Sequence, residues 1–334
     1  MAKVALRVAL IGAGRMARTH ANVLAQVGDV DIVVVCDSTL ERAESLAALH
    51  DARATTRLDE VLNDASVKAA IVATPTGTHA LLVEQLAVAG KHIFVEKPVA
   101  DDLGGAQRVV AAVEAAGVRC QVGFQRRYDP AYREAKRAID AAELGQVEGF
   151  RAVSRDAEPP ALRFLESSGG LMVDLAIHDL DAARFLVGEV SEVHCIGSVQ
   201  TMPELSEHGL FDTAVATLRF ENGALGTLEA GLRTVYGYDI RTEVLGSQGR
   251  VHLEMDRRLQ LLRYDASGGR FDRPRDFEQR FSEAYAAEIR AFARAIEDGS
   301  LVMPDAVDAT ATLRLALAAQ RSLETGEVVK LAGS

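Results

Sequence analysis

The chain has 334 residues, of which 48% are hydrophobic and 25% charged, and its formal net charge is −11. This length is typical of about two domains, and the composition is that of a globular protein. The acidic balance disfavours binding to nucleic acid and to anionic membrane surfaces. No apolar run reaches the roughly 18 residues that span a bilayer, and the N-terminal stretch lacks a signal-peptide cleavage site. We therefore expect a cytoplasmic protein.

The cysteines and histidines predict no metal site. Cys36, Cys120 and Cys195 each lie in an apolar run, and no two of them have the spacing of metal ligands. We expect three buried thiols in a reducing compartment. The eight histidines are scattered along the chain and suggest no metal cofactor either.

Strand-like and helix-like segments alternate through the first third of the chain. The expected strands occupy residues 6–14, 31–37, 68–75, 91–98 and 118–125. Repeated strand-then-helix units with short connections predict a doubly wound parallel sheet, that is, a Rossmann domain over residues 1–125.

The pattern changes after about residue 125. The expected strands there occupy residues 147–156, 192–201, 212–231, 238–254 and 259–265. The expected helices occupy residues 130–145, 174–188, 284–299 and 304–326, the last with Asp305 as its N-cap. Successive strands predict a second, α+β domain over residues 126–334, with a large open mixed or antiparallel sheet that helices cover on one face. We expect the last helix to pack back on the first domain. Because an uncovered apolar face usually finds a partner, we also expect a homo-oligomer through this sheet.

A glycine-rich turn follows the first strand, with the pattern Gly12-x-Gly14-x-x-Ala17. Between a strand and a helix, these residues are typical of a dinucleotide-binding turn, because the first glycine makes the turn and the second lets a pyrophosphate approach. The following helix N-terminus presents free N–H groups to the phosphates. We therefore place Arg15 and Met16 at the cofactor as well.

The second strand ends in Asp37, about 20 residues beyond Gly14, where a ribose-binding acid is expected. A carboxylate there accepts hydrogen bonds from ribose hydroxyls and repels a 2′-phosphate, which favours NAD over NADP. Arg42 leaves NADP open, because a nearby guanidinium can hold a phosphate. Ser38 belongs to the same expected site.

A further set of polar residues follows the third strand, at the edge where ligands bind in such sheets. This set comprises Thr74, Pro75, Thr76 and His79. Thr76 or Thr78 is a candidate cap for the next helix. His79, in its first turn, fits either a structural role or a contact with the cofactor.

Glu96 and Lys97 close the fourth strand, and Pro98 follows them. Charged residues at the end of a buried strand are costly unless they have partners. At the carboxyl end of this strand, Lys97 is placed to meet the reactive end of the cofactor. Taken alone, the motif equally fits a surface lysine paired with Glu96, which we expect to support the loop or the cofactor.

Downstream, Asp174 and His178 are spaced i, i+4, which puts them on one face of a helix. An aspartate so placed orients an imidazole and raises its basicity, as suits a general base. Asp181 shares this face. The alternative is a solvated polar face.

The glycine-rich turn, the Glu96-Lys97-Pro98 sequence and the Asp174–His178 helix together resemble the Gfo/Idh/MocA oxidoreductase family, over nearly the whole chain. The resemblance implies an active site in which Lys97 holds or polarises a hydroxyl and His178 takes its proton. Asp174 would steady His178 while hydride passes to NAD.

Within the family, the stretches GFQRRYDPAY, SRDAEPP, VDLAIHDLDAARFL and VYGYDIRTEVLGSQG are most similar to inositol dehydrogenases. This resemblance implies NAD-dependent oxidation of a cyclitol, foremost myo-inositol to its 2-keto form, by a dimer or tetramer. It places these residues in a polyol pocket: Lys97, Arg126 or Arg127, Asp156, Asp174, His178, Asp181 and Tyr236. Gln125 stands where methionine is common, and Asp156 where asparagine can occur.

Three alternatives stay open. The substrate can be another inositol isomer or an aldose. The chain can also be a glycoside hydrolase that retains NAD and regenerates it each turn. A non-catalytic sugar-sensing protein on the same fold is the third alternative, because fold alone does not fix function.

Overall fold

The computed structural model describes residues 5–254, 263–266, 268–270 and 272–331. The chain divides into two compact units. The first contains Met1–Tyr128 and Glu283–Leu313, and the second contains Asp129–Ser282 and Arg314–Ser334. The sequence-based boundary at residue 125 differs from this division chiefly because residues 283–313 join the first unit.

The first unit contains a six-stranded parallel sheet with the order β3-β2-β1-β4-β5-β6, which is typical of dinucleotide-binding folds. Its strands are β1 (Leu6–Ile11), β2 (Val30–Cys36), β3 (Arg53–Thr55), β4 (Ala69–Val72), β5 (His92–Glu96) and β6 (Cys120–Gly123). Its helices are α1 (Arg15–Leu24), α2 (Leu40–Ala47), α3 (Leu58–Leu62), α4 (His79–Val88), α5 (Leu103–Ala116) and most of α10 (Phe277–Asp298). The predicted doubly wound sheet is confirmed, while β3 and α3 escaped the sequence reading because both are very short.

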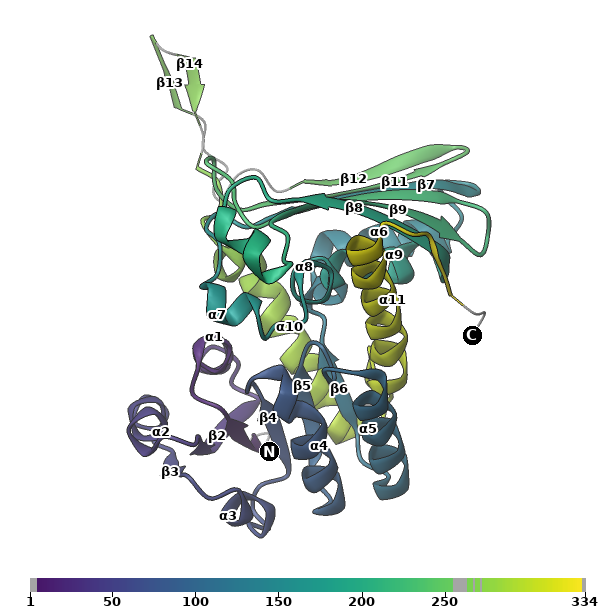
Figure 1. The fold of residues 1–334 in the computed structure, drawn as a ribbon. Helices are drawn as coiled ribbons and strands as arrows, with labels where there is room; N and C mark the ends of the chain where they lie inside the picture. Colours follow the sequence, from purple (N-terminus) through teal and green to yellow (C-terminus); the bar gives the residue numbers. More distant parts are fainter. Residues whose placement is uncertain (1–4, 255–262, 267, 271, 332–334) are drawn as a thin grey trace. The chain divides into compact units, whose positions relative to one another are not determined.

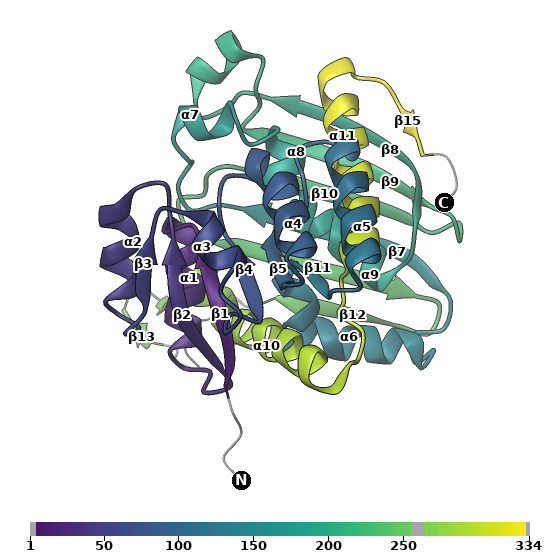
Figure 2. The same cartoon turned by 90° about the horizontal axis from the view of Figure 1, so that it is seen from below.

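Helices cover both faces of this sheet, which explains why its strands are apolar throughout. Helices α4 and α5 lie side by side on one face (Figure 2). The core joins β1 to α1 and to α10, through residues such as Leu10, Ala21 and Phe292. This packing on the sheet is the physical reason that residues 283–313 belong to the first unit.

The second unit contains a seven-stranded sheet with the order β12-β11-β7-β10-β9-β8-β15. Its strands are β7 (Val147–Arg155), β8 (Val190–Ser198), β9 (Thr213–Phe220), β10 (Leu225–Gly231), β11 (Asp239–Gly246), β12 (Gly249–Glu254) and β15 (Val329–Lys330). The pair β7–β10 is parallel, and the other neighbours are antiparallel. The predicted open mixed sheet is confirmed.

Helices cover one face of this second sheet. They are α6 (Pro130–Asp140), α7 (Leu162–Leu165), α8 (Leu171–Asp174), α9 (Ile177–Leu186) and the end of α11 (Ala306–Thr325). Figure 1 shows α6, α8 and α9 on the same side of the strands. Along β9, buried and accessible side chains alternate, as expected of a sheet with one covered face.

Aspartates cap four of the longer helices. The expected N-cap Asp305 is confirmed, since its carboxylate accepts the Asp308 N–H at 2.9 Å. Asp102, Asp129 and Asp276 do the same for α5, α6 and α10. Each such cap satisfies an N–H that the helix leaves unpaired and contributes about 1 kcal/mol.

The single helix predicted over residues 174–188 is wrong in detail. The chain forms α8 and α9, with a wider turn between them in which the Ala176 N–H reaches the Leu171 carbonyl. The strand expected at residues 259–265 lies partly outside the described residues, and β13 (Arg263–Asp265) pairs there with β14 (Gly268–Arg270). Across the described part of the chain, no helix is long and apolar enough to cross a membrane.

Candidate active site

The glycine-rich turn lies at the carboxyl end of β1. Gly12 has φ +100°, and a Cβ there would lie 2.6 Å from the Ala73 carbonyl oxygen, so only glycine fits. A Cβ on Gly14 would meet no described atom within 4 Å. Gly14 also gives α1 no side-chain cap. The open backbone and the uncapped helix start fit the pyrophosphate of a dinucleotide. Arg15 and Met16 form the first turn of α1.

Asp37 follows β2 and is held by two backbone groups. Its carboxylate accepts the Ala13 N–H at 2.8 Å and the Thr39 N–H at 2.9 Å. Arg42 lies 3.2 Å from the same carboxylate and donates to the Thr39 hydroxyl. A carboxylate has about four acceptor positions, so Asp37 keeps capacity for ribose hydroxyls. Ser38, beside it, is exposed.

The loop after β4 is tied together by its own side chains. The Thr74 and Thr78 hydroxyls lie 2.7 Å apart, and Thr78 donates to the Pro75 carbonyl. Thr78 therefore does not cap α4 with its side chain, and neither does Thr76, which begins a short 3-10 turn. Pro75 is exposed and Thr76 is half-buried, after the carboxyl end of β4.

His79 links this loop to the loop that carries Lys97. Its ring nitrogens lie 2.8 Å from the Pro98 carbonyl oxygen and 2.9 Å from the Thr74 carbonyl oxygen. Burial lowers the pKa of His79, and the two carbonyls oppose that shift. Because both nitrogens face backbone acceptors, the geometry favours a role in holding the two loops together. A direct contact with cofactor stays a prediction.

Lys97 is half-buried and comes directly after β5. Its backbone N–H donates to the Glu96 carboxylate at 3.2 Å. Glu96 turns inward and its carboxylate lies 2.6 Å from the Nε2 of His20, which is completely buried on α1. His20 is not among the residues predicted from the sequence. Its only signal is a histidine among the apolar positions of α1.

In the second unit, Asp174 ends α8 and His178 lies in the first turn of α9. Asp174 and His178 are half-buried, whereas every other residue of the run 171–183 is buried. The turn between the helices keeps a right-handed helical backbone at Leu175 and Ala176. The two polar side chains are therefore accessible on successive turns of the chain, although not within one regular helix. Asp181 is buried, and so is Asp179, which the sequence analysis did not single out.

The other predicted substrate residues of this unit lie where the end of β7 meets the end of β10 and the start of β11. Arg155 at the end of β7 pairs with Gly231 at the end of β10 and with Asp239 at the start of β11. Asp156 and Tyr236 lie in the loops that leave these strand ends. Both are accessible to solvent, Asp156 partly and Tyr236 by 48%.

A charged network fixes Tyr236. Its hydroxyl donates to the buried Asp239 carboxylate at 2.8 Å, and the Arg241 guanidinium donates two hydrogen bonds to the same carboxylate. Arg273 lies over the Tyr236 ring, 5.1 Å from its centroid. Burial and Asp239 together raise the pKa of the Tyr236 phenol, so its proton is retained and remains directed at Asp239.

The two predicted arginines belong to the first unit, in the 3-10 turn Gln125–Tyr128. Arg126 is only 2% exposed. Arg127 is mostly buried and forms an ion pair with Asp308. Gln125 is buried beside them. The ion pair gives Arg127 a structural partner.

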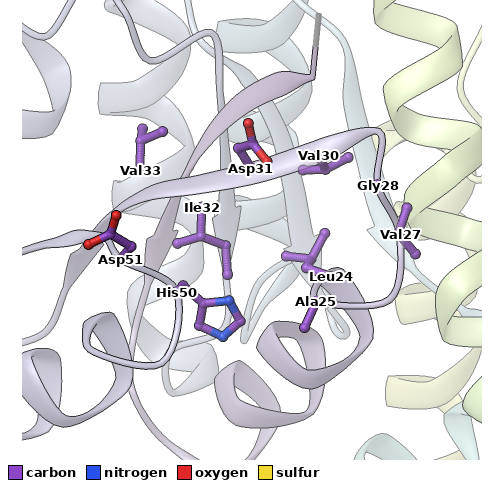
Figure 3. A pocket seen from close by; sticks show the side chains of 10 residues that line it. All are labelled: Leu24, Ala25, Val27, Gly28, Val30, Asp31, Ile32, Val33, His50 and Asp51. Carbon is purple, nitrogen blue, oxygen red and sulfur yellow. The ribbon is translucent and has the colours of Figure 1, made fainter. Parts of the chain in front are cut away.

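A shallow cavity of about 320 Å³ lies elsewhere in the first unit (Figure 3). It is lined by Leu24, Ala25, Val27, Gly28, Val30, Asp31, Ile32, Val33, His50 and Asp51. Since α1 ends and β2 begins there, the cavity lies at the amino ends of the strands. The predicted cofactor residues lie at the carboxyl ends, so the cavity is not part of the predicted site.

The described residues contain no cluster of three His, Cys, Asp or Glu side chains placed to hold a metal ion. The three cysteines are buried and unpaired with one another. Burial raises the pKa of Cys36 to about 11 and those of Cys120 and Cys195 to about 12. Thiols with such values are unreactive near neutral pH.

The glycine-rich turn, the ribose-type acid and the strand-end lysine define a dinucleotide-dependent oxidoreductase built on a Rossmann sheet. Residues 6–124 match the model for an oxidoreductase family with an NAD-binding Rossmann fold, and residues 132–252 match the GFO/IDH/MocA C-terminal domain. The chain belongs to the Gfo/Idh/MocA family, as the sequence predicted.

Named relatives agree along almost the full length. The chain is 38% identical to scyllo-inositol 2-dehydrogenase (NAD(+)) from Bacillus subtilis, covering 98% of this chain and 96% of the relative. It is 35% identical to myo-inositol 2-dehydrogenase from Thermotoga maritima, covering 98% of each. The crystal structure of scyllo-inositol dehydrogenase from Lactobacillus casei with bound NAD(H) and scyllo-inositol matches with a TM-score of 0.92. That match has 26% identity and covers 98% of this chain and 99% of the other.

Proposed function

We propose that the protein oxidises a cyclitol with NAD, with myo-inositol and its 2-keto product as the leading pair. The observation that carries this proposal is the joint presence of a dinucleotide turn, Lys97 at the ligand edge, and the accessible Asp174 and His178. Both named relatives act on inositols and are 35–38% identical over nearly the whole chain. One is named for the scyllo isomer and one for the myo isomer, so both isomers belong in the substrate test.

NAD, when bound, supplies the hydride acceptor. The residues of the chain then have the following roles. The Lys97 ammonium donates a hydrogen bond to the reacting hydroxyl and stabilises the charge that develops on its oxygen. An imidazole nitrogen of His178 takes the hydroxyl proton, and the Asp174 carboxylate stabilises the resulting imidazolium. This scheme requires the two units to present Lys97 and His178 to one hydroxyl.

The polyol pocket follows from the same argument. A cyclitol carries a hydroxyl on every ring carbon, and a site that hydrogen-bonds each hydroxyl discriminates strongly between isomers. We assign this role to Asp156, Asp181, Tyr236 and one of the arginines, Arg126 or Arg127. The tethered Tyr236 phenol is the best supported of these, because the Asp239 carboxylate and the Arg273 guanidinium both hold it.

The test is a panel of myo-, scyllo- and chiro-inositol and of aldoses with NAD, read as NADH absorbance. We expect net NADH with at least one cyclitol and a higher kcat/KM for it than for any aldose. Absence of NADH with every member would overturn the proposal. Cleavage of a glycoside without net NADH would indicate the NAD-retaining hydrolase, which regenerates its cofactor each turn. Sugar binding with no turnover of any kind would indicate a sensor.

We also propose that NAD is preferred over NADP. Asp37 would oppose a 2′-phosphate, although Arg42 lies next to it. Comparing kcat/KM with the two cofactors tests this, and a higher value with NADP would contradict it. In Asp37→Ser the ratio of NAD to NADP efficiency should fall about tenfold or more, since hydrogen bonds to charged groups contribute about 1.5–3 kcal/mol.

Finally, we propose a homo-oligomer, and by resemblance a tetramer, in the cytoplasm. The uncovered face of the second sheet exposes Ile196, Val215, Leu225 and Leu245. Exposed apolar residues gathered on one sheet face are typical of subunit interfaces. The three buried thiols suit a reducing compartment.

A further inference from the structure

Four polar side chains gather inside the first unit, beneath β5, the strand that precedes Lys97. They are His20, Glu96, Gln121 and Glu288, and each is at most 6% exposed. The sequence analysis singled out Glu96 alone, and the proposed catalytic scheme uses none of them. Buried charges are costly unless paired, so this cluster calls for an explanation.

The packing places Glu288 close enough to Glu96 for the two carboxyl groups to interact electrostatically. On α10, Tyr285, Glu288 and Phe292 are spaced i, i+3 and i+7 and so share one face. Tyr285 packs edge-on against His20 at 5.8 Å, and Phe292 packs against Phe94 at 5.9 Å. Glu288 lies between these two contacts.

The sheet supplies the opposite wall of the cluster. Phe94 and Glu96 lie two residues apart on β5 and face the same side. Their partners on β6 are Gln121 and Gly123, and the Gln121 amide donates to the Glu288 backbone carbonyl. A Cβ on Gly123 would lie 3.2 Å from a Glu96 carboxylate oxygen. The glycine therefore leaves the room that the Glu96 carboxylate occupies.

The two glutamates differ in their partners. Glu96 pairs with His20 at 2.6 Å and accepts the Lys97 N–H at 3.2 Å. Both carboxyl oxygens of Glu288 are buried and lack a hydrogen-bond partner among the described residues. An ionised carboxylate cannot persist so placed, whereas a neutral carboxyl can. Burial and the nearby Glu96 charge raise the pKa of Glu288 well above its usual value.

We propose that Glu288 is a positioning residue for Lys97. Its neutral carboxyl backs Glu96, so that the cluster holds a single carboxylate, and this carboxylate fixes the backbone of Lys97 and the ring of His20. If Glu288 lost its proton, a second negative charge would oppose Glu96 and disturb the start of the Lys97 loop. The groups that face Glu288 are Glu96 from β5, His20 from α1, the neutral Gln121 from β6, and Tyr285 on its own helix. The inference rests on the proposed role of Lys97.

The first experiment measures the free energy of unfolding of wild type and Glu288→Gln between pH 4 and pH 9. A raised carboxyl pKa means that the folded state keeps a proton that the unfolded chain loses above about pH 4.5. Wild type should therefore lose about tenfold in its folding equilibrium constant per pH unit, relative to Glu288→Gln, until Glu288 ionises in the folded protein. Glu288→Met, also neutral, should reproduce this slope if the glutamine folds poorly. If the difference in free energy of unfolding between wild type and Glu288→Gln does not change with pH, the inference that the Glu288 carboxyl is neutral is wrong.

Asp212 provides a matched control, because it is a buried carboxyl whose pKa is shifted in the opposite direction from that of Glu288. It is equally buried, at 1% exposure. Although burial raises the pKa of a carboxyl, the N–H groups of Gln200, Thr201 and Met202 outweigh that effect and lower the pKa of Asp212. Asp212→Asn should be less stable than wild type at neutral pH, and this difference should shrink as the pH falls below about 4.

The second experiment measures the chemical reactivity of the Lys97 amine and needs no substrate. The rate of acetylation of Lys97 by acetic anhydride is followed against pH by peptide mass spectrometry, with the exposed Lys68 as the internal reference. We expect the pH curve of the Lys97-to-Lys68 ratio in wild type to depart at alkaline pH, by more than about twofold, from the curves of Glu288→Gln and Glu288→Met, which should coincide with each other. Identical curves in wild type and both variants would overturn the positioning role.

This design separates the two proposals. If no cyclitol yields NADH, the proposed function fails, while the stability and labelling results still decide the role of Glu288. If cyclitols are oxidised, the alkaline limb of kcat/KM should move upward by at least about half a pH unit in both neutral variants. An unmoved limb would overturn the positioning role and leave the dehydrogenase proposal intact.

Discussion

The glycine-rich turn and Asp37 of the first unit are positioned by different means from Tyr236 of the second unit. In the first unit, backbone geometry dominates: Gly12 makes a turn that a Cβ would block, and Asp37 is held by two backbone N–H groups. In the second unit, side chains hold side chains, as when Asp239 fixes both Tyr236 and Arg241. A backbone-built site suits a cofactor that does not vary, whereas a side-chain-built site can be altered residue by residue to fit different polyols.

The two units also differ in how helices cover their sheets. Helices cover both faces of the six-stranded sheet but one face of the seven-stranded sheet (Figure 1). The first unit can therefore bury its apolar strands alone. The second exposes Leu225 by 55% and Ile196 by 61% on its uncovered face. Four predictions test this contrast, beginning with the largest expected effect.

Lys97→Met and His178→Ala should each lower kcat by at least about 10²-fold, because each removes a group assigned to proton transfer or charge stabilisation. The NAD dissociation constant, measured by isothermal titration calorimetry, should change far less in His178→Ala. Steady-state rates with the best cyclitol provide the main readout. Near-normal kcat in both variants would contradict the catalytic roles proposed for Lys97 and His178.

Gly12→Ala and Gly14→Ala separate folding from cofactor binding in the first unit. At Gly12 the alanine adopts a left-handed φ at a cost of about 1–3 kcal/mol and meets the Ala73 carbonyl, so both Tm and NAD affinity should fall. At Gly14 the φ is −78° and no described atom is near, so Tm should stay within about 2 °C while NAD binding weakens about tenfold. Equal Tm losses in the two variants would contradict this distinction.

Asp239→Asn tests the side-chain network of the second unit. Loss of the buried charge should release Tyr236 and Arg241 and raise the KM for cyclitol about tenfold, since such hydrogen bonds contribute about 1.5–3 kcal/mol. The KM for NAD should not change. Glu229→Gln, which breaks an exposed ion pair with Arg155, is the control and should change the KM by no more than about twofold. A larger change of the cyclitol KM in Glu229→Gln than in Asp239→Asn would show that the Asp239 network does not determine substrate binding.

Leu225→Glu tests the uncovered sheet face. A charge on this face should oppose association and lower the mass measured by light scattering, with little change in kcat per subunit. Leu81→Glu is the matched control, because Leu81 is similarly exposed, by 60%, but lies on α4 of the first unit. Its mass should equal that of wild type. An unchanged mass in Leu225→Glu, or a monomeric wild type, would refute association through this face.

Much of the first unit could be predicted because its signals are local. The apolar strands, the glycine turn, Asp37 and Lys97 follow one another at regular spacing, and the ends of parallel strands meet at one edge. Asp305 was likewise predictable as a cap from its position before a helix. By contrast, β3 is only three residues long and gives no periodic signal.

The sequence by itself determined the Rossmann pattern, the family and the residue types suited to hydride and proton transfer. Only the tertiary structure placed residues 283–313 with the first unit, divided the Asp174–His178 segment into two helices, and brought Glu288 close to Glu96. Glu96 and Glu288 are nearly 200 residues apart in the sequence, and residues 283–313 pack on a strand near the start of the chain. Such contacts depend on which helix packs over which strand, and the periodicity of one segment carries no information about its distant partner.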